Sequence, residues 1–158
     1  MKIYIKFFTL TFLKSLFYVI SIMFSLIFIL NLLTELEFFK EVEVAVSFPI
    51  LLSLLNSPTM IFEMLPFIFL ITTQLFFIKL FNNNEIEIFK YSGLKNISIL
   101  KVFSLITILT GIILTIIFYN FSAIFKNFYL EEKTKFTTDS KYLAVITKNG
   151  LWIKDEIN

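Results

Sequence analysis

Uncharged apolar residues fall in long continuous blocks along this chain. Residues 15–34 and residues 102–125 contain no charged side chain, which gives blocks of 20 and 24 residues. At about 1.5 Å of rise per residue, helices of these lengths reach roughly 30 and 36 Å, enough to cross the hydrocarbon core of a bilayer. The pattern therefore predicts a mainly α membrane protein.

A third apolar block runs from Val44 to Ile78 and is interrupted by Glu63 and by three prolines. We expect one further span in it, beginning near Pro58 and ending near Lys79, with Pro66 early in the helix, where a kink is tolerated. The predicted transmembrane domain covers residues 1–130, with spans at about 12–34, 58–80 and 101–125.

Glu63 is the acidic residue inside the predicted second span. We expect it about one turn inside the N-terminal end of that helix, where the helix dipole favours an anion. A carboxylate at the bilayer centre costs roughly 2.5–3.5 kcal/mol on insertion scales, and less near the interface. The simpler interpretation is a solvated interfacial glutamate, and a place on a substrate path is the alternative.

Composition narrows the possible chemistry. Hydrophobic residues make up 58% of the chain and 22 of its residues are Phe, which is far from soluble-domain usage. Cys and His are absent, and all 14 basic residues are Lys, so disulfides, Ser-His or Cys-His nucleophile pairs and the usual zinc ligands are excluded. The net charge of +2 comes without a basic stripe that would favour nucleic acid. We expect no cofactor and no catalytic activity.

The distribution of lysines predicts the orientation in the membrane. Lys2, Lys6 and Lys14 precede the first span, whereas residues 35–63 hold five Glu and one Lys. Loop 79–101 again carries four Lys. By the positive-inside rule, the N-terminus and loop 79–101 are cytoplasmic and the C-terminal tail lies outside. Lysines in that tail oppose this orientation, but we give them less weight because the tail begins a folded domain.

The loop segment around residues 84–93 supports two local interpretations. Residues 85–88 alternate between Glu and Ile like a strand. Asn84 suits a helix N-cap, Glu85 and Glu87 suit a first turn, and Gly93 suits the position after a helix. We prefer the short helix, because a lone strand has no partner in so short a loop.

The C-terminal tail changes character after Lys126. Asn149-Gly150 separates two β-prone runs, residues 142–148 and 151–154, which is a strong hairpin pattern. We expect residues 131–158 to be the start of a β domain that is truncated at Asn158, since a hairpin alone is marginal in water.

The predicted spans, the loop segment and the C-terminal tail, taken in their order along the chain, resemble the LptF/LptG family of lipopolysaccharide export permeases. The resemblance rests on three stretches: SPTMIFEMLPF at 57–67, NEIEIFKYSGLK at 84–95 and NGLWIKD at 149–155. Residues 57–67 resemble the segment that enters the second span in family members, and residues 84–95 resemble their coupling segment. Residues 149–155 are similar to a stretch typical of LptG and not of LptF.

The resemblance implies a complete architecture and a set of partners. Family members have three spans on each side of a periplasmic β-jellyroll, and an LptG-type and an LptF-type permease pair over a dimer of the cytosolic ATPase LptB, joined by the bitopic protein LptC. This ABC-type assembly extracts lipopolysaccharide from the inner membrane of Gram-negative bacteria. By the match, Glu85 and Glu87 are acidic residues of the ATPase-coupling helix and Gly93 ends it.

Two departures from the family pattern leave an alternative open. The second half of the family architecture is absent, which favours a small structural or assembly protein of the membrane without transport activity. Basic residues near the outer end of the first span are replaced by Asn31, Glu35 and Glu37, so Lys40 is the nearest cation for a lipid phosphate. Lys40 and Glu63 are therefore the candidate residues of a lipid path.

Overall fold

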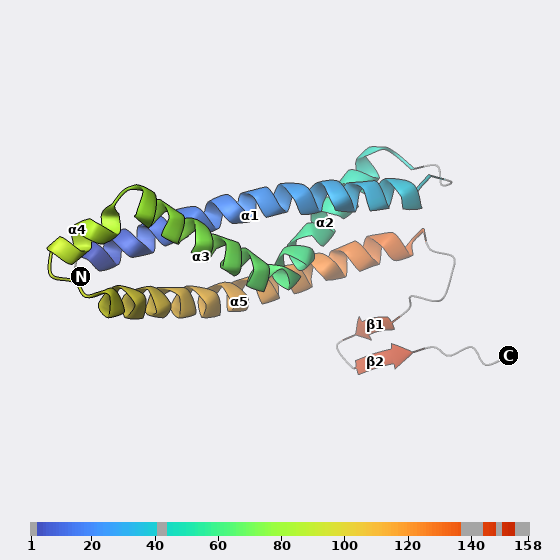
Figure 1. Ribbon diagram of the computed structural model, residues 1–158. Coiled ribbons are helices and arrows are strands. Elements are labelled where there is room, and N and C mark those ends of the chain that lie inside the picture. The colour runs from blue at the N-terminus through green and yellow to red at the C-terminus, as the bar shows by residue number, and fades with distance from the viewer. Residues whose placement is uncertain (1–2, 41–43, 137–143, 148–149, 154–158) are drawn as a thin grey trace.

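The computed structural model describes residues 3–40, 44–136, 144–147 and 150–153. These residues form five helices and two short strands (Figure 1). The helices are α1 (Ile3–Phe38), α2 (Ser47–Glu63), α3 (Leu65–Asn82), α4 (Glu85–Tyr91) and α5 (Asn96–Thr134), and the strands are β1 (Ala144–Thr147) and β2 (Gly150–Ile153). The prediction of a mainly α protein is confirmed.

Three of the described helices, α1, α3 and α5, are long and apolar enough to cross a membrane. With 36 and 39 residues, α1 and α5 reach about 54 and 58 Å, well beyond a hydrocarbon core of about 30 Å. The first and third predicted spans thus lie inside longer helices, whose ends extend past the apolar blocks.

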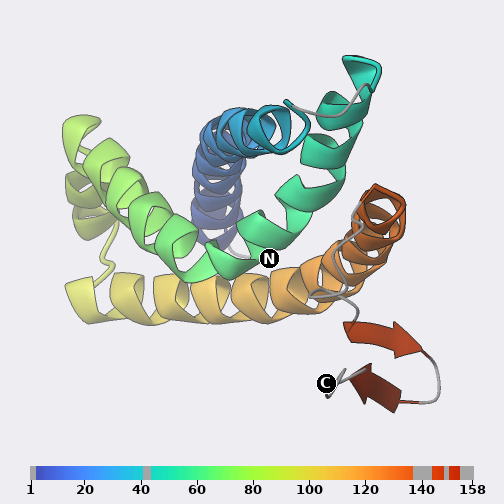
Figure 2. The same ribbon diagram turned by 90° about the vertical axis from the view of Figure 1, so that its right-hand side faces the viewer.

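The middle of the chain differs from the single helix that the sequence predicts. Two helices, α2 and α3, meet at Met64 and form the two arms of a V around α1 (Figure 2). Pro66, in the first turn of α3, has no N–H to donate to the carbonyl of Phe62, which interrupts the helical hydrogen-bond ladder at this point. Pro58 lies inside α2 and does not start a helix.

This break also corrects the expected position of Glu63. The residue is the last of α2 and not part of a helix N-terminus. Its carboxylate therefore lies at the C-terminal end of a helix dipole, which does not favour an anion. The expectation that Glu63 lies one turn inside the N-terminal end of a helix is wrong.

The helices of the bundle have two distinct ends (Figure 1). The start of α1, all of α4 and the start of α5 lie together at one end, called here the α4 end. The end of α1, the start of α2 and the end of α5 lie at the opposite end. Helix α1 runs beside both α2 and α3, and α2 packs along α5.

Aromatic rings form most of the core near the α4 end. The buried side chains of Phe8, Phe12, Phe76 and Phe103 come from α1, α3 and α5. The rings of Phe76 and Phe103 stack with centroids 4.4 Å apart, and Phe12 meets Phe103 edge-on at 5.5 Å. Such pairs contribute about 0.5–1.5 kcal/mol each beyond the burial of their area. The three helices are thereby held in one packed unit.

The two strands pair antiparallel, with Thr147 opposite Gly150 and Ala144 opposite Ile153. They occupy the two β-prone runs on either side of the predicted turn. Residues 148 and 149, which include the Asn of the Asn-Gly pair, lie outside the described residues, as do 137–143 and 154–158.

Candidate functional site

The short helix α4 occupies the position where the sequence favours a helix over a strand, and the structure confirms the helix. Asn84 stands at its N-cap position in the left-handed conformation, with φ of +54°, and its side chain makes no capping hydrogen bond. The neighbouring Asn83 instead donates from Nδ2 to Oε1 of Glu85, at 3.2 Å. Asn84 thus occupies the predicted N-cap position, but its side chain does not cap the helix.

The end of α4 is closed by a Schellman motif centred on Gly93. The Gly93 N–H donates to the carbonyl of Lys90 at 2.9 Å, and the Leu94 N–H donates to the carbonyl of Phe89 at 3.0 Å. Gly93 has φ of +84°, a conformation that glycine adopts at little cost. The prediction that Gly93 ends this helix is confirmed.

An apolar contact anchors α4 to the beginning of α1. The Phe89 ring lies 4.9 Å from the ring of Phe8 and 5.5 Å from that of Phe7, measured between centroids. Ile86, on the same helix, also packs against the aromatic core. Helix α4 is therefore joined to the membrane helices by packing as well as by its short connections.

The two carboxylates in the first turn of α4 have different surroundings. Glu87 is exposed, whereas Glu85 is half-buried. The Oε2 atom of Glu85 is buried and has no hydrogen-bond partner within the part of the chain that the structure describes. A covered acceptor without a donor costs about 1–3 kcal/mol, so Glu85 gains if a donor arrives from outside.

Glu63 lies at the point of the V formed by α2 and α3. It is exposed and lines an open groove of about 430 Å³ between the V and α5. The groove is lined by Phe62, Glu63, Leu65, Pro66, Phe69, Gly111 and Thr115. No hydrogen bond or ion pair of Glu63 occurs among the described residues.

Lys40 lies elsewhere, in the exposed turn that follows α1. Its backbone N–H donates to the carbonyl of Glu37 at 3.3 Å. The structure therefore does not bring the two candidate lipid-path residues together, since Glu63 lies part-way along the bundle and Lys40 lies at one end.

A polar cluster that the sequence analysis did not anticipate joins α1 to α5 at the end opposite α4. Lys133 donates from Nζ to both carboxylate oxygens of Glu35, at 2.8 and 2.9 Å, and the Tyr129 hydroxyl donates to Oε1 of Glu35 at 2.8 Å. The Glu35 side chain is only 3% exposed. We call these three residues the Glu35 cluster.

A second polar network lies close by and adds α2. Asn31 donates to Ser57 at 3.4 Å, Asn56 donates to Asn31 at 3.2 Å, and Lys126 donates to the side-chain oxygen of Asn56 at 2.9 Å. We call it the Asn31 network. Its partners lie 25 to 70 positions apart in the sequence, which is why no local pattern predicts it. The only sequence feature that pointed to this network was the presence of polar side chains near the edges of the apolar blocks.

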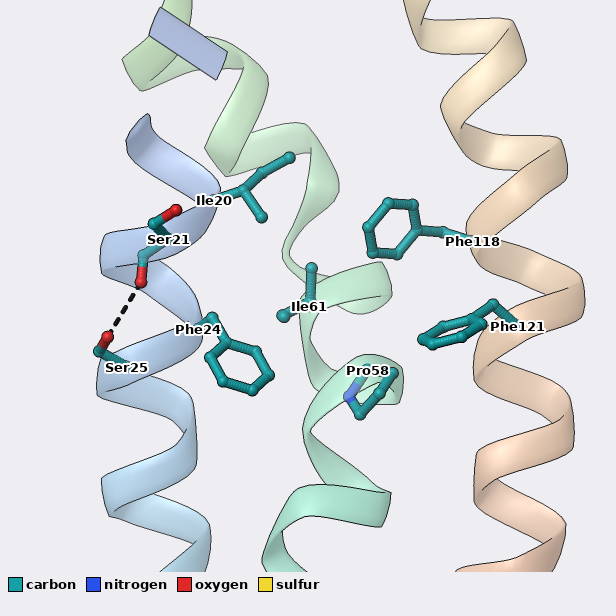
Figure 3. A pocket seen from close by; sticks show the side chains of 8 residues that line it. All are labelled: Ile20, Ser21, Phe24, Ser25, Pro58, Ile61, Phe118 and Phe121. Carbon is teal, nitrogen blue, oxygen red and sulfur yellow. Dashed lines mark hydrogen bonds between the residues drawn. The ribbon is translucent and has the colours of Figure 1, made fainter. Parts of the chain in front are cut away.

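An apolar recess of about 420 Å³ lies between α1, α2 and α5 (Figure 3). Phe24 and Ile20 come from α1, Pro58 and Ile61 from α2, and Phe118 and Phe121 from α5. Ser25 also lines it, but its hydroxyl donates back to the carbonyl of Ser21 within α1, at 3.0 Å. The surface of the recess is thus suited to hydrocarbon.

Three apolar crossing helices with a small anchored helix at one end define a multi-pass α-helical membrane protein. The chain matches the family model of the lipopolysaccharide export system permeases LptF/LptG over residues 6–158, and it belongs to this family. No curated protein and no solved structure matches the chain. The chain is therefore an inner-membrane lipopolysaccharide export permease, a transporter subunit and not an enzyme.

Proposed function

We propose that the chain is an LptG-type permease subunit of an ABC-type system, which extracts lipopolysaccharide with energy from a separate cytosolic ATPase. The observation that supports this most is helix α4. It carries two acidic residues in its first turn, it is closed by Gly93, and it packs onto α1 through Phe89. A short, rigid and acidic helix at one end of a membrane bundle is suited to receive force from a soluble motor.

The packing gives this proposal its mechanical basis. Phe89 contacts Phe8, and Phe8 in turn meets Phe76 on α3, with ring centroids 6.1 Å apart. A displacement of α4 therefore reaches α1 and α3 through packed side chains, since packed cores move as units. The stacked rings of Phe76 and Phe103 extend the contact to α5.

The two carboxylates supply the chemistry of docking. Exposed Glu87 is available to a lysine or arginine of the ATPase, and charge-assisted hydrogen bonds of this kind are among the stronger ones in proteins. Glu85 has a covered oxygen that lacks a donor among the described residues, so rotation of its side chain toward a donor of the ATPase would satisfy it. Docking is then favoured at both residues.

The proposed assembly follows the family pattern. The α4 end faces the cytoplasm and an LptB-type ATPase dimer, and the opposite end faces the periplasm. An LptF-type permease and an LptC-type bitopic protein complete the complex, and β1 and β2 begin the periplasmic jellyroll. Exposed Lys40 at the periplasmic end contacts lipid phosphate. Lipopolysaccharide phosphates repel a carboxylate, so Glu63 is unsuited to contact them.

Reversal of charge at Glu85 tests the proposal. Glu85→Lys is expected to lower co-purification of the ATPase at least fivefold, because it replaces the acceptor with a cation that repels the basic donor of the ATPase, while insertion into the membrane stays unchanged. Glu131→Lys, an exposed glutamate at the other end of α5, is the matched control and is expected to keep the ATPase. Undiminished ATPase recovery with Glu85→Lys would remove Glu85 from the docking role.

A further inference from the structure

The groove beside Glu63 presents a carboxylate inside an apolar surface. No hydrogen bond or ion pair of this carboxylate occurs among the described residues. Most of the remaining lining is apolar, from Leu65, Phe69 and their neighbours. A surface of this kind is complementary to a donor that carries positive charge.

The groove opens at a depth where lipid hydrocarbon would surround it. Thr115, in its lining, lies 13 residues after Val102 and 10 residues before Phe125, the limits of the uncharged block in α5. At about 1.5 Å per residue, these intervals correspond to roughly 20 and 15 Å along the helix. Acyl chains cannot solvate a carboxylate, and an ionised side chain deep in the bilayer costs about 2.5–3.5 kcal/mol.

Lys126, a cation that interacts electrostatically with Glu63, is already engaged elsewhere. Lys126 lies within electrostatic reach of Glu63, but its ammonium group donates to Asn56 at 2.9 Å and lies over the ring of Tyr129 at 4.8 Å. Lys126 also follows the uncharged block, nearer to the end of α5 than Thr115. Its charge therefore moderates the cost of burying Glu63 in the membrane without providing a direct partner.

We propose that the Glu63 groove is the docking site of another membrane-spanning helix, one that lies outside residues 1–158 and carries a lysine or arginine at this depth. The inference deepens the proposed function by naming the chemistry of a partner, and it rests on the membrane placement of the permease and not on ATPase coupling. Acidic side chains within membrane spans usually face a bundle interior and pair with an opposite charge.

The opposite wall of the groove suits a helix by shape. Gly111 and Thr115 lie one turn apart on α5, and small residues at this spacing let a second backbone approach closely. A Cβ atom at Gly111 would lie 3.8 Å from the Phe69 ring, so this ring borders the groove beside the glycine. Lipid headgroup amines, which could also neutralise a carboxylate, lie at the membrane surface and not at this depth.

A photocrosslinker placed in the groove tests the proposal in the complete membrane complex. Thr115→p-benzoylphenylalanine places the probe in the groove, and Ile117→p-benzoylphenylalanine is the control at nearly the same depth on the far side of α5. Mass spectrometry then identifies the crosslinked peptide or lipid. Each probe is combined with native Glu63, with Glu63→Gln and with Glu63→Asp.

We expect the Thr115 probe to capture a transmembrane peptide that contains Lys or Arg within about one turn of the crosslink. Glu63→Gln is expected to lower its yield at least threefold, Glu63→Asp to preserve it, and the Ile117 probe to be indifferent to both. Lipid adducts alone, a peptide without a basic residue, or an unchanged yield with Glu63→Gln would overturn the proposal. ATPase recovery, measured in the same samples, reports separately on the coupling role of α4.

Discussion

Lys133 on α5 donates from its ammonium group to both carboxylate oxygens of Glu35 on α1, at 2.8 and 2.9 Å. The two residues lie 98 positions apart in the chain, and Glu35 is almost completely buried. Together with the Tyr129 hydroxyl, this ion pair joins the ends of the two longest helices at the end opposite α4. The bundle is thus held by aromatic packing near α4, and at the other end polar bonds reinforce a second cluster of packed apolar side chains.

A single and a double variant test this relationship. Lys133→Met leaves the Glu35 carboxylate buried without its cation, and breaking such a pair costs about 3–5 kcal/mol of the free energy of unfolding. The double variant Glu35→Leu/Lys133→Met removes both charges and is expected to lie within about 2 kcal/mol of the native protein, since no carboxylate stays buried without its cation. Unfolding by a denaturing detergent in mixed micelles measures both, and a double variant as unstable as Lys133→Met would contradict the ion-pair account.

Truncation of Phe89 separates docking from transmission. Phe89→Ala removes the ring contacts to Phe7 and Phe8 and leaves Glu85 and Glu87 in place. We expect ATPase co-purification to stay within about twofold and ATP-driven release of lipopolysaccharide from proteoliposomes to fall at least fivefold, because α4 no longer moves with α1. Phe89→Leu keeps most of the apolar volume and serves as the control with a smaller loss. Normal release with Phe89→Ala would show that these contacts do not carry the motion.

Substitution of Gly93 tests the orientation of α4. With φ of +84° and open space around the position of a Cβ atom, Gly93→Ala adds backbone strain of about 1–2 kcal/mol without a steric clash. If α4 changes its orientation to relieve that strain, the same free energy is lost on binding, and the affinity for the ATPase falls by about 5- to 30-fold. Gly93→Asn, which tolerates this conformation better, is expected to lose less. Equal affinities for the Ala and Asn variants, measured by titration of the ATPase, would rule out this explanation.

Sequence patterns predicted those elements whose causes are local. The uncharged blocks at 15–34 and 102–125 placed α1 and α5, because length and apolarity alone decide whether a helix can span a membrane. The first-turn glutamates and Gly93 predicted α4, because the end of a short helix depends on one residue that accepts positive φ. The family resemblance was confirmed over residues 6–158.

Features that depend on distant contacts were not predicted. The sequence predicts one helix with Pro66 at a position that tolerates a kink, and it does not show the break at Met64 or that α2 turns away to pack on α5. Glu35 was noted only as a replaced basic position, although its partners Tyr129 and Lys133 come from the far end of the chain. The contacts between these polar residues could not be predicted from the sequence, because they form only when the fold brings distant helices together.

Accessibility of α4 from the two sides of the membrane tests the central claim most directly. The chain has no Cys, so Glu87→Cys and Glu131→Cys each introduce a single thiol, at exposed positions near opposite ends of the bundle. With a membrane-impermeant maleimide, we expect Glu87→Cys to be labelled in inside-out vesicles and protected in spheroplasts, and Glu131→Cys to show the reverse. Labelling of Glu87→Cys in intact spheroplasts would place α4 in the periplasm and contradict the account.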